Sequence, residues 1–279
     1  MSRFIAGPPT GPVVIPEAVK AVMLPGDEAK PVWLNELGGL TFRLHPARVN
    51  PCSAEYVAAG GARYVKWSPK EAARPVGESS LPQAASPVGS NLAAEAERLN
   101  WAGQWVSVPE VLEYRDVGTG EVMVTKAVPG HSAASPFWRA RPQEAATALG
   151  KGLRAFHDAL PVEECPFSWS VAERIEHGGI AGSPMADALL ASEPPEGEFV
   201  VCHGDPCAPN LLIDNFGYVT GYLDLGRLGV ASRWADLAVA AWSTEWNYGP
   251  GYENLVYQGY GMIPDLEKIS YYRRLWDET

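Results

Sequence analysis

Four polar residues lie close together in one segment of the second half of the chain, VVCHGDPCAPNLLIDNFGYVTGYLDLGRLGVASRWADLA. They are His203, Asp205, Asn210 and Asp224, and they stand beside short apolar stretches that read as strands. Loops at strand ends, held by a rigid scaffold, are where polar side chains can be directed toward a cleft. The segment therefore indicates a site built from two carboxylates and an amide.

Such a set suits phosphoryl transfer, in which charge spreads over the oxygens of the moving group. Mg²⁺ prefers hard oxygen ligands and keeps most of its waters, so one carboxylate and one amide suffice to hold it. Asn210 and Asp224 fit that role. Asp205 fits as the base that meets the acceptor hydroxyl. The short loop from Asp205 to Asn210 can direct Asp205 toward the acceptor and Asn210 toward the metal ion.

Other polar residues of the second half are expected to support this site rather than react. His203 is predicted to orient the backbone of its loop. Asp236, at the start of a predicted helix, is expected to stabilise the catalytic loop or to interact with the helix dipole. Arg227, which closes the run Asp224-Leu225-Gly226-Arg227, is also assigned a structural role. His157 lies on the apolar face of a predicted helix, as a hydrogen-bonded core histidine would.

The elements that must position these groups are short strands followed by helices. Three strands are predicted at 199–202, 211–214 and 219–223. Apolar residues at helical spacing predict a helix over 143–160. Further helical stretches are expected at about 170–177, at 183–192 and over most of the chain from 233 onward.

The first half reads mainly as strands and turns. A hairpin is predicted over 31–44 with Gly38-Gly39 near its bend, and strands are predicted at 62–67 and 121–128. Asn91 is a suitable N-cap for a helix that runs to about residue 105. Residues 68–90 are rich in Pro, Ser and Ala, which predicts a long surface loop.

The amino-acid composition limits the classes of binding partner that are expected. The net charge is −11 in 279 residues, which disfavours nucleic acid and would favour a cationic substrate. No stretch approaches the ~18 uninterrupted apolar residues of a membrane helix, so no membrane partner is expected. The four cysteines show no zinc or disulfide spacing, which is typical of a reduced, cytoplasmic protein. A monomer is favoured.

The pattern His203-Gly204-Asp205-x₄-Asn210 followed by Asp224-Leu225-Gly226-Arg227 resembles the catalytic and metal-binding loops of eukaryotic-type kinases, and most closely aminoglycoside O-phosphotransferases. The stretches 153–167 and 264–278 are similar to other parts of that family. The resemblance implies an α+β, protein-kinase-like fold of two lobes. A small sheet-rich N-lobe would span 1–128 and a larger helical C-lobe 129–279, with ATP bound between them.

The resemblance also implies roles outside the catalytic segment. Lys66 would contact the α- and β-phosphates of ATP, and Glu95 would pair with Lys66 and fix its direction. Asp277 and Glu278 would meet ammonium or guanidinium groups of the substrate. The backbone and loop groups that would surround the nucleotide are Gly38, Gly39 and Thr41 over the phosphates and Thr125 to Ala127 beside adenine.

The predicted function is the Mg²⁺- and ATP-dependent phosphorylation of a hydroxyl on a cationic aminoglycoside antibiotic. The CHGDPC-x-PN signature favours streptomycin 3″-kinases over kanamycin and neomycin 3′-phosphotransferases. A kinase of choline, homoserine or a sugar is an alternative of the same fold. From other classes, a metal-dependent phosphoesterase would need further ligands, yet the five histidines are scattered, and a pseudo-kinase regulator is disfavoured by the intact Asp205, Asn210 and Asp224.

Overall fold

The computed structural model describes residues 6–35, 38–46, 61–70, 91–195 and 197–279. The chain divides into two compact units. The first consists of Met1–Asn100 and Pro109–Ala127, and the second of Trp101–Val108 and Val128–Thr279. The sequence prediction placed a single boundary after residue 128; the structure divides the chain after Ala127 and also assigns the segment 101–108 to the second unit.

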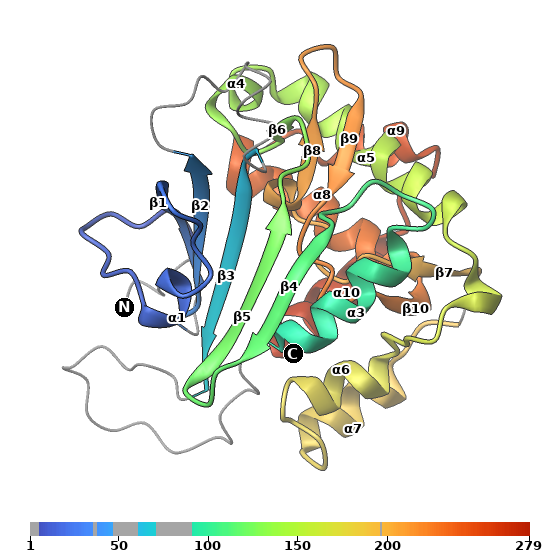
Figure 1. The fold of residues 1–279 in the computed structure, drawn as a ribbon. Coiled ribbons are helices and arrows are strands. Elements are labelled where there is room, and N and C mark those ends of the chain that lie inside the picture. The colour runs from blue at the N-terminus through green and yellow to red at the C-terminus, as the bar shows by residue number, and fades with distance from the viewer. Residues whose placement is uncertain (1–5, 36–37, 47–60, 71–90, 196) are drawn as a thin grey trace. The chain divides into compact units, whose positions relative to one another are not determined.

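The first unit is built on a five-stranded antiparallel sheet in the order β1-β2-β3-β5-β4 (Figure 1). The strands are β1 (Asp27–Leu34), β2 (Leu40–Pro46), β3 (Arg63–Pro69), β4 (Val111–Asp116) and β5 (Gly120–Lys126). The helices are α1 (Glu17–Lys20) and α3 (Leu92–Ala102), whose last two residues belong to the second unit.

The two faces of this sheet differ because successive side chains of a strand point to opposite sides. Phe42, Val65 and Val124 are register partners, and they form an apolar cluster with Val19 of α1. Lys66 follows Val65 in β3, so its side chain lies on the other face. The core therefore lies on one side of the sheet and the candidate phosphate-binding lysine on the other.

Two sequence predictions for this unit are confirmed in detail. β1 and β2 pair antiparallel as the predicted hairpin requires, and Gly38 adopts the left-handed φ of +82° that glycine tolerates best. Asn91 caps α3, since its Oδ1 accepts from the amide of Ala94 at 2.9 Å. The predicted loop 68–90 begins later than expected, because β3 extends to Pro69, and residues 71–90 lie outside the described residues.

The second unit is mostly helical and carries two small sheets. One sheet pairs β10 with β7, and the other has the order β6-β8-β9. The strands are β6 (His131–Ser132), β7 (Phe199–Cys202), β8 (Leu211–Ile213), β9 (Val219–Tyr222) and β10 (Gly229–Ser232). The helices are α4 (Pro136–Arg139), α5 (Pro142–Ala159), η1 (Val162–Glu164), α6 (Val171–His177), α7 (Pro184–Ala191), η2 (Ala208–Asn210), α8 (Trp234–Tyr248), α9 (Glu253–Tyr260) and α10 (Leu266–Glu278).

Helix α5 is central to the second unit. It packs against α8 and α9 and also contacts β7, β8 and β9. Its apolar face, which includes Leu149, Leu153 and Phe156, is buried, as the helical spacing predicted. The loops that follow β7 and β9 carry the candidate catalytic residues, so the α5 core supports the site from beneath its strands. None of the described helices has the length and apolarity needed to cross a bilayer.

Candidate catalytic site

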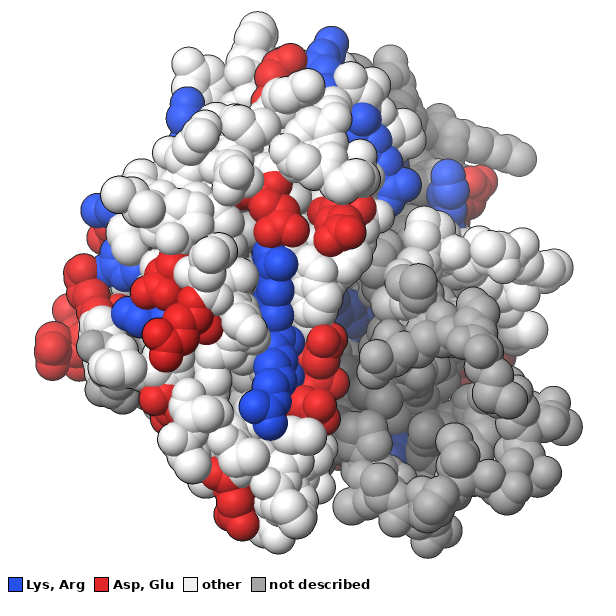
Figure 2. Space-filling model, turned by 180° about the vertical axis from the view of Figure 1, so that it is seen from behind, with Lys and Arg blue, Asp and Glu red and all other residues white. Residues whose placement is uncertain are grey.

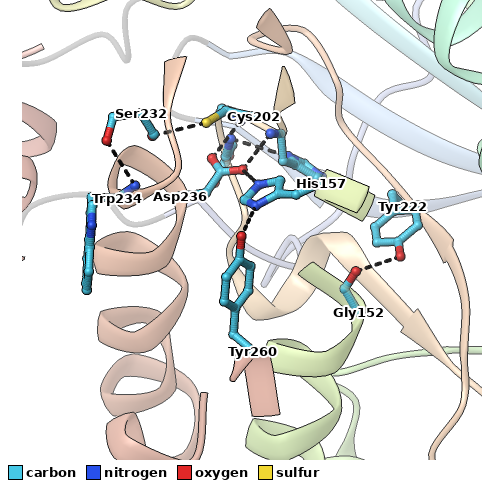
Figure 3. A network of polar contacts seen from close by, with 11 residues as sticks. Gly152, His157, Cys202, Tyr222, Ser232, Trp234, Asp236 and Tyr260 are labelled. Atoms are coloured by element: carbon cyan, nitrogen blue, oxygen red, sulfur yellow. Dashed lines mark hydrogen bonds and ion pairs between the residues drawn. The ribbon is translucent and has the colours of Figure 1, made fainter. Parts of the chain in front are cut away.

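Asp236 anchors the backbone of the catalytic loop. It lies in the first turn of α8 and is completely buried. Its Oδ2 accepts from the amide of His203 at 2.6 Å, and its Oδ1 accepts from the amide of Gly204 at 3.0 Å (Figure 3). One buried carboxylate thus holds the two residues that precede Asp205, as the sequence predicted for a structural support.

His157 of α5 supports Asp236 in turn. Its Nε2 lies 3.0 Å from Oδ2 of Asp236, and its Nδ1 lies 2.8 Å from the hydroxyl of Tyr260. Burial works to raise the pKa of Asp236, but the hydrogen bonds that it accepts from His157 and from the amide of His203 outweigh burial and keep that pKa below its ordinary value. Asp236 therefore stays ionised, and His157 is the hydrogen-bonded core histidine that was predicted.

His157, Cys202 and Asp236 also place three metal-ligand atoms within 4.8 Å of one another. Both oxygens of Asp236 already accept hydrogen bonds, and the Cys202 thiol donates to the carbonyl of Ser232 at 3.3 Å. Burial raises the pKa of this thiol well above its ordinary value, so it remains protonated. His157 and Asp236 are hydrogen-bonded to each other and the Cys202 thiol to Ser232, so hydrogen bonds account for the three side chains without a metal ion.

His203 shapes the loop through its ring. Its Nδ1 accepts from the amide of Asp205 at 3.3 Å, which requires the proton of the neutral ring to be on Nε2. Burial lowers the pKa of His203 despite the opposing charges of Asp236, Asp205 and Asp224. A neutral, buried imidazole that accepts from the backbone agrees with the orienting role expected for His203.

Asn210 joins the two loops that carry the carboxylates. Its side-chain Nδ2 donates to the carbonyl oxygen of Asp205 at 3.0 Å. Its own carbonyl accepts from the amide of Leu223, the residue before Asp224, at 2.8 Å. Because Nδ2 is used in this way, the side-chain Oδ1 is the atom left for a cation. The structure therefore brings Asp205, Asn210 and Asp224 into one junction.

Asp224 has an unusual backbone. Its φ is +62°, and it is the single non-glycine residue with positive φ among those described. Aspartate tolerates this region better than most residues, but the conformation still carries strain that the surrounding loop must hold. The side chain of Asp224 is exposed. A carboxylate oxygen from Asp224 and an amide oxygen from Asn210 are hard-oxygen donors of the kind that suits Mg²⁺.

Asp205 is half-buried, and its Oδ1 is buried without a hydrogen-bond partner in the described part of the chain. Buried polar atoms are nearly always paired, so an unpaired carboxylate oxygen indicates a group that awaits a ligand donor. Burial and then the charge of Asp205 raise the pKa of the Cys207 thiol well above its ordinary value. Cys207 is thus a protonated neighbour of the candidate base, not a nucleophile.

Arg227 lies against the catalytic loop and near the end of α10. A side chain at Gly204 would overlap the carbonyl oxygen of Arg227. The guanidinium carbon of Arg227 lies 5.5 Å from the ring centre of Trp276, which precedes Asp277 and Glu278. Both acidic side chains are exposed in the last turn of α10. Their contact with a substrate stays a prediction.

The first unit contains the expected ion pair. Nζ of Lys66 on β3 lies 2.6 Å from Oε1 of Glu95 on α3. Glu95 is only 5% exposed, so its charge requires a partner inside the unit. Thr41 is the register partner of Lys66 on β2 and therefore shares its face of the sheet. A nucleotide contact of Lys66 or Thr41 stays a prediction.

Other predicted nucleotide contacts are occupied within the first unit. The amide of Gly39 donates to Oδ1 of Asn35 at 2.6 Å, as in a tight hairpin turn. Thr125 is paired inside the sheet, and the amide of Ala127 donates to the carbonyl of Ala62 at 3.0 Å. For the amide of Ala127 to bind adenine, it would have to give up its hydrogen bond to Ala62. The predicted nucleotide contacts of Gly38, Gly39 and Thr125 remain predictions.

Sequence reasoning missed a cluster of two arginines and two tryptophans near the catalytic loop. Arg174 of α6 is 2% exposed, and its guanidinium lies near both Trp169 and Trp276, as that of Arg227 does. One signal was available, since Arg174 shares an apolar helix face with Val171 and Ile175. Sequence reasoning also missed Ser243, whose hydroxyl accepts from the amide of Ala208 at 3.1 Å.

Acidic and basic side chains are mixed rather than segregated on one described face of the molecule. Figure 2 shows acidic and basic side chains interspersed on one face, with a row of basic groups flanked by acidic ones. Many of the basic side chains pair locally; for example, Nε of Arg154 lies 2.6 Å from Oδ2 of Asp158. No broad basic patch is visible among the described residues of this face, which agrees with the net charge of −11.

The chain is similar to known phosphotransferases. Residues 83–272 match the profile of the Phosphotransferase enzyme family. An aminoglycoside 3′-phosphotransferase from Streptomyces fradiae is 35% identical over 70% of this chain and 82% of its own length. A streptomycin 3″-kinase from Streptomyces griseus is 32% identical over 67% of this chain and 79% of its own length.

Solved structures give the same result. An aminoglycoside 3′-phosphotransferase of type VIII has a TM-score of 0.71 and 27% identity, covering 94% of this chain and 98% of its own. The phosphotransferase APH(3″)-Id from Streptomyces rimosus, in complex with ADP and streptomycin, has a TM-score of 0.62 and 25% identity, covering 90% and 92%. The predicted kinase-like α+β fold is therefore confirmed.

Proposed function

Because the chain belongs to the Phosphotransferase enzyme family, we propose that it transfers the γ-phosphoryl group of ATP to a hydroxyl of an aminoglycoside. The observation that carries this proposal is the junction at Asn210, which ties the backbone of Asp205 to the strand end that presents Asp224. Relatives named for aminoglycosides and a similar structure bound to ADP and streptomycin support both substrates.

Asp205 would receive the acceptor hydroxyl. Its unpaired Oδ1 can accept the hydroxyl proton, which orients the oxygen for attack on the phosphoryl group. The loop is held from the other side by His203 and Asp236, so the carboxylate needs little rearrangement when the acceptor arrives. Such a positioned base contributes about 10²–10⁴-fold to the rate.

Asn210 and Asp224 would hold Mg²⁺ through Oδ1 and the carboxylate. When bound, the ion would neutralise charge on the nucleotide phosphates. Lys66, fixed by Glu95, would contact the same phosphates as a directed ammonium group. The hydrogen bond of Asn210 and the ion pair of Lys66 with Glu95 support these proposed tasks.

Two acceptor types compete within this proposal. The CHGDPC-x-PN signature favours streptomycin at its 3″-hydroxyl. The identity to a 3′-phosphotransferase is 35%, slightly above the 32% to the streptomycin kinase. This similarity keeps kanamycin or neomycin as the second candidate acceptor. The exposed Asp277 and Glu278 could meet ammonium or guanidinium groups of either acceptor.

The test is ADP release from Mg-ATP with streptomycin, kanamycin, neomycin, choline and homoserine as separate acceptors. We expect turnover with an aminoglycoside and none with choline or homoserine. Turnover with streptomycin alone would identify the 3″ type, and turnover with kanamycin and neomycin alone the 3′ type. Turnover with choline or homoserine alone would reject the aminoglycoside assignment. Phosphate release from a phosphoester without nucleotide would instead indicate a hydrolase.

A further inference from the structure

Two guanidinium groups of the second unit lie between the same two indole rings. The Cζ atom of Arg174 is 5.7 Å from the ring centre of Trp169 and 6.0 Å from that of Trp276. The Cζ atom of Arg227 is 5.8 Å and 5.5 Å from the same two rings. Ring faces attract cations, so the tryptophans hold two like charges close together. We refer to these four residues as the Arg-Trp cluster.

Neither guanidinium group has an acidic partner among the residues that the structure describes. In the described part of the chain, neither Arg174 nor Arg227 forms an ion pair or donates a side-chain hydrogen bond. Arg174 is 2% exposed, and its Nε is buried with no partner. Burial, and then the charge of Arg227, lower the pKa of Arg174 to about 10, so it still carries its charge at neutral pH.

Buried arginine is normally satisfied by carboxylate, phosphate or carbonyl oxygens. Two adjacent guanidinium groups offer up to ten N–H donors, and leaving a buried charged donor unpaired is costly. Ring faces compensate the charge in part but accept few of these hydrogen bonds. The cluster thus has the composition of an oxyanion-binding site. The protein supplies the cationic donors, and a ligand would supply the oxyanion.

The position of the cluster suggests which oxyanion. Arg227 packs its backbone on Gly204, the residue before Asp205. Its charge also acts on the Cys207 thiol, which neighbours the Asp205 carboxylate. Arg227 and Trp276 are half-buried and so accessible, whereas Arg174 and Trp169 are buried. A phosphoryl group attached to an acceptor at Asp205 would lie close to this accessible side.

We propose that Arg174 and Arg227, held by Trp169 and Trp276, form a binding site for a phosphate oxyanion. The link to the newly transferred phosphoryl group rests on the proposed function, but binding of inorganic phosphate does not. Arg227 contacts the oxyanion directly, and Arg174 raises the local positive potential behind it. The site retains the phosphorylated product or takes free phosphate.

The test is a titration of the full chain with inorganic phosphate at constant ionic strength, without ATP or acceptor, followed by tryptophan fluorescence and thermal unfolding. We expect a saturable fluorescence change and a rise in Tm, because a ligand of the folded state stabilises it. Sodium chloride at matched ionic strength should produce neither. Absence of a saturable response to phosphate would overturn the proposal.

Variants locate the site. Arg227→Met should weaken phosphate binding by about tenfold or more, the loss expected for a hydrogen bond to a charged group. Arg174→Met tests the buried partner, and Arg174→Lys, which keeps the charge, provides a second variant in case the first fails to fold. Arg274→Met is the matched control, since Arg274 is an exposed arginine of the same α10 helix that carries Trp276. Unchanged affinity in Arg227→Met, or an equal loss in Arg274→Met, would refute the assignment.

A second arm separates the two sources of phosphate. The phosphorylated acceptor, purified from the reaction, is added as a competitor of inorganic phosphate. Competition that is lost in Arg227→Met supports capture of the transferred group, and phosphate binding without competition supports a free-phosphate site. If the kinase reaction fails with every acceptor while phosphate still binds, the oxyanion site stands and only the proposed function falls.

Discussion

The side-chain amide of Asn210 donates to the carbonyl oxygen of Asp205 over 3.0 Å. The same residue accepts, through its backbone, from the amide of Leu223 beside Asp224. A single residue, through its side chain and its backbone, thus couples the loop of the candidate base to the loop of the candidate metal ligand. We therefore expect a substitution at position 210 to affect both acceptor orientation and metal binding, and one at Asp224 to affect only metal binding.

Replacing Asn210 by Ala removes the side-chain half of this coupling, since the backbone bond to Leu223 does not depend on the side chain. We expect the Mg²⁺ concentration needed for half-maximal activity to rise by about 10–100-fold, the range seen when groups that orient metal ligands are lost. The affinity for the acceptor should fall as well, because the Asp205 loop loses a hydrogen bond. Activity measured against Mg²⁺ and acceptor concentration tests both effects. Asn215→Ala, at an exposed turn, is the control, and equal behaviour of the two variants would contradict the coupling.

Asp205→Asn should lower kcat by about 10²–10⁴-fold while leaving the folded structure intact. The amide is nearly isosteric with the carboxylate but cannot accept the hydroxyl proton. The control is Asp158→Asn, which changes the same charge at an exposed position of α5. Steady-state kinetics with the preferred acceptor gives the comparison. Retention of wild-type kcat in Asp205→Asn would remove Asp205 from the chemistry.

The sequence predicted most elements because the periodic segments are long or strongly alternating. The helix over 143–160 was found within one residue at each end, since five apolar positions recur on one face. The strand β4 and the short strand β10 were not predicted. β4 has exposed residues throughout its second half, so it lacks the alternation that marks a half-buried strand.

The candidate site was predictable in its residue types but not in its connections. The spacing of Asp205, Asn210 and Asp224 indicated a kinase-like loop. The support of Asp236 by His157 joins residues 79 positions apart, and such pairings depend on tertiary packing that no local pattern encodes. The Arg-Trp cluster likewise combines α6, α10 and two loops, so its like charges meet only in the folded chain.

Lys66→Met should raise the KM for ATP by about tenfold or more, because a charge-assisted contact to phosphate is lost. The buried Glu95 would also be left without its ammonium partner. Glu95→Gln keeps a side chain of the same size and should produce a smaller effect, since Lys66 keeps its charge but loses its fixed direction. Lys30→Met is the control, as Lys30 is an exposed lysine on β1. Equal KM values for Lys66→Met and Lys30→Met would argue against a phosphate contact.

The ionisation of Asp236 predicts an acid limit to stability. Its folded-state pKa lies below the unfolded value of about 3.9, so its contribution is fully present above that pH. The contribution is lost as the pH falls through the folded pKa. Asp236→Asn should cost about 3–5 kcal/mol of unfolding free energy at neutral pH, because His157 and two backbone amides lose a charged partner.

Unfolding curves between about pH 3 and pH 7 test this prediction. The difference in stability between wild type and Asp236→Asn should shrink as the pH falls below the unfolded pKa of Asp236. A difference that stays constant over that range would show that the charge of Asp236 is not what stabilises the loop.

A comparison of Gly204 with Gly217 distinguishes two effects of adding a side chain at a glycine with positive φ: backbone strain and steric overlap with neighbouring atoms. Both have positive φ, +84° and +92°, so alanine carries similar backbone strain of about 1 kcal/mol at either position. A Cβ at Gly217 meets nothing within 4 Å, whereas one at Gly204 would overlap the carbonyl oxygen of Arg227. Gly204→Ala should therefore destabilise the protein more than Gly217→Ala and should also reduce kcat, since the clash displaces the loop that presents Asp205. Denaturant unfolding and steady-state kinetics of the two variants provide the measurement, and equal losses in both would mean that the close packing of Gly204 on Arg227 does not hold the catalytic loop.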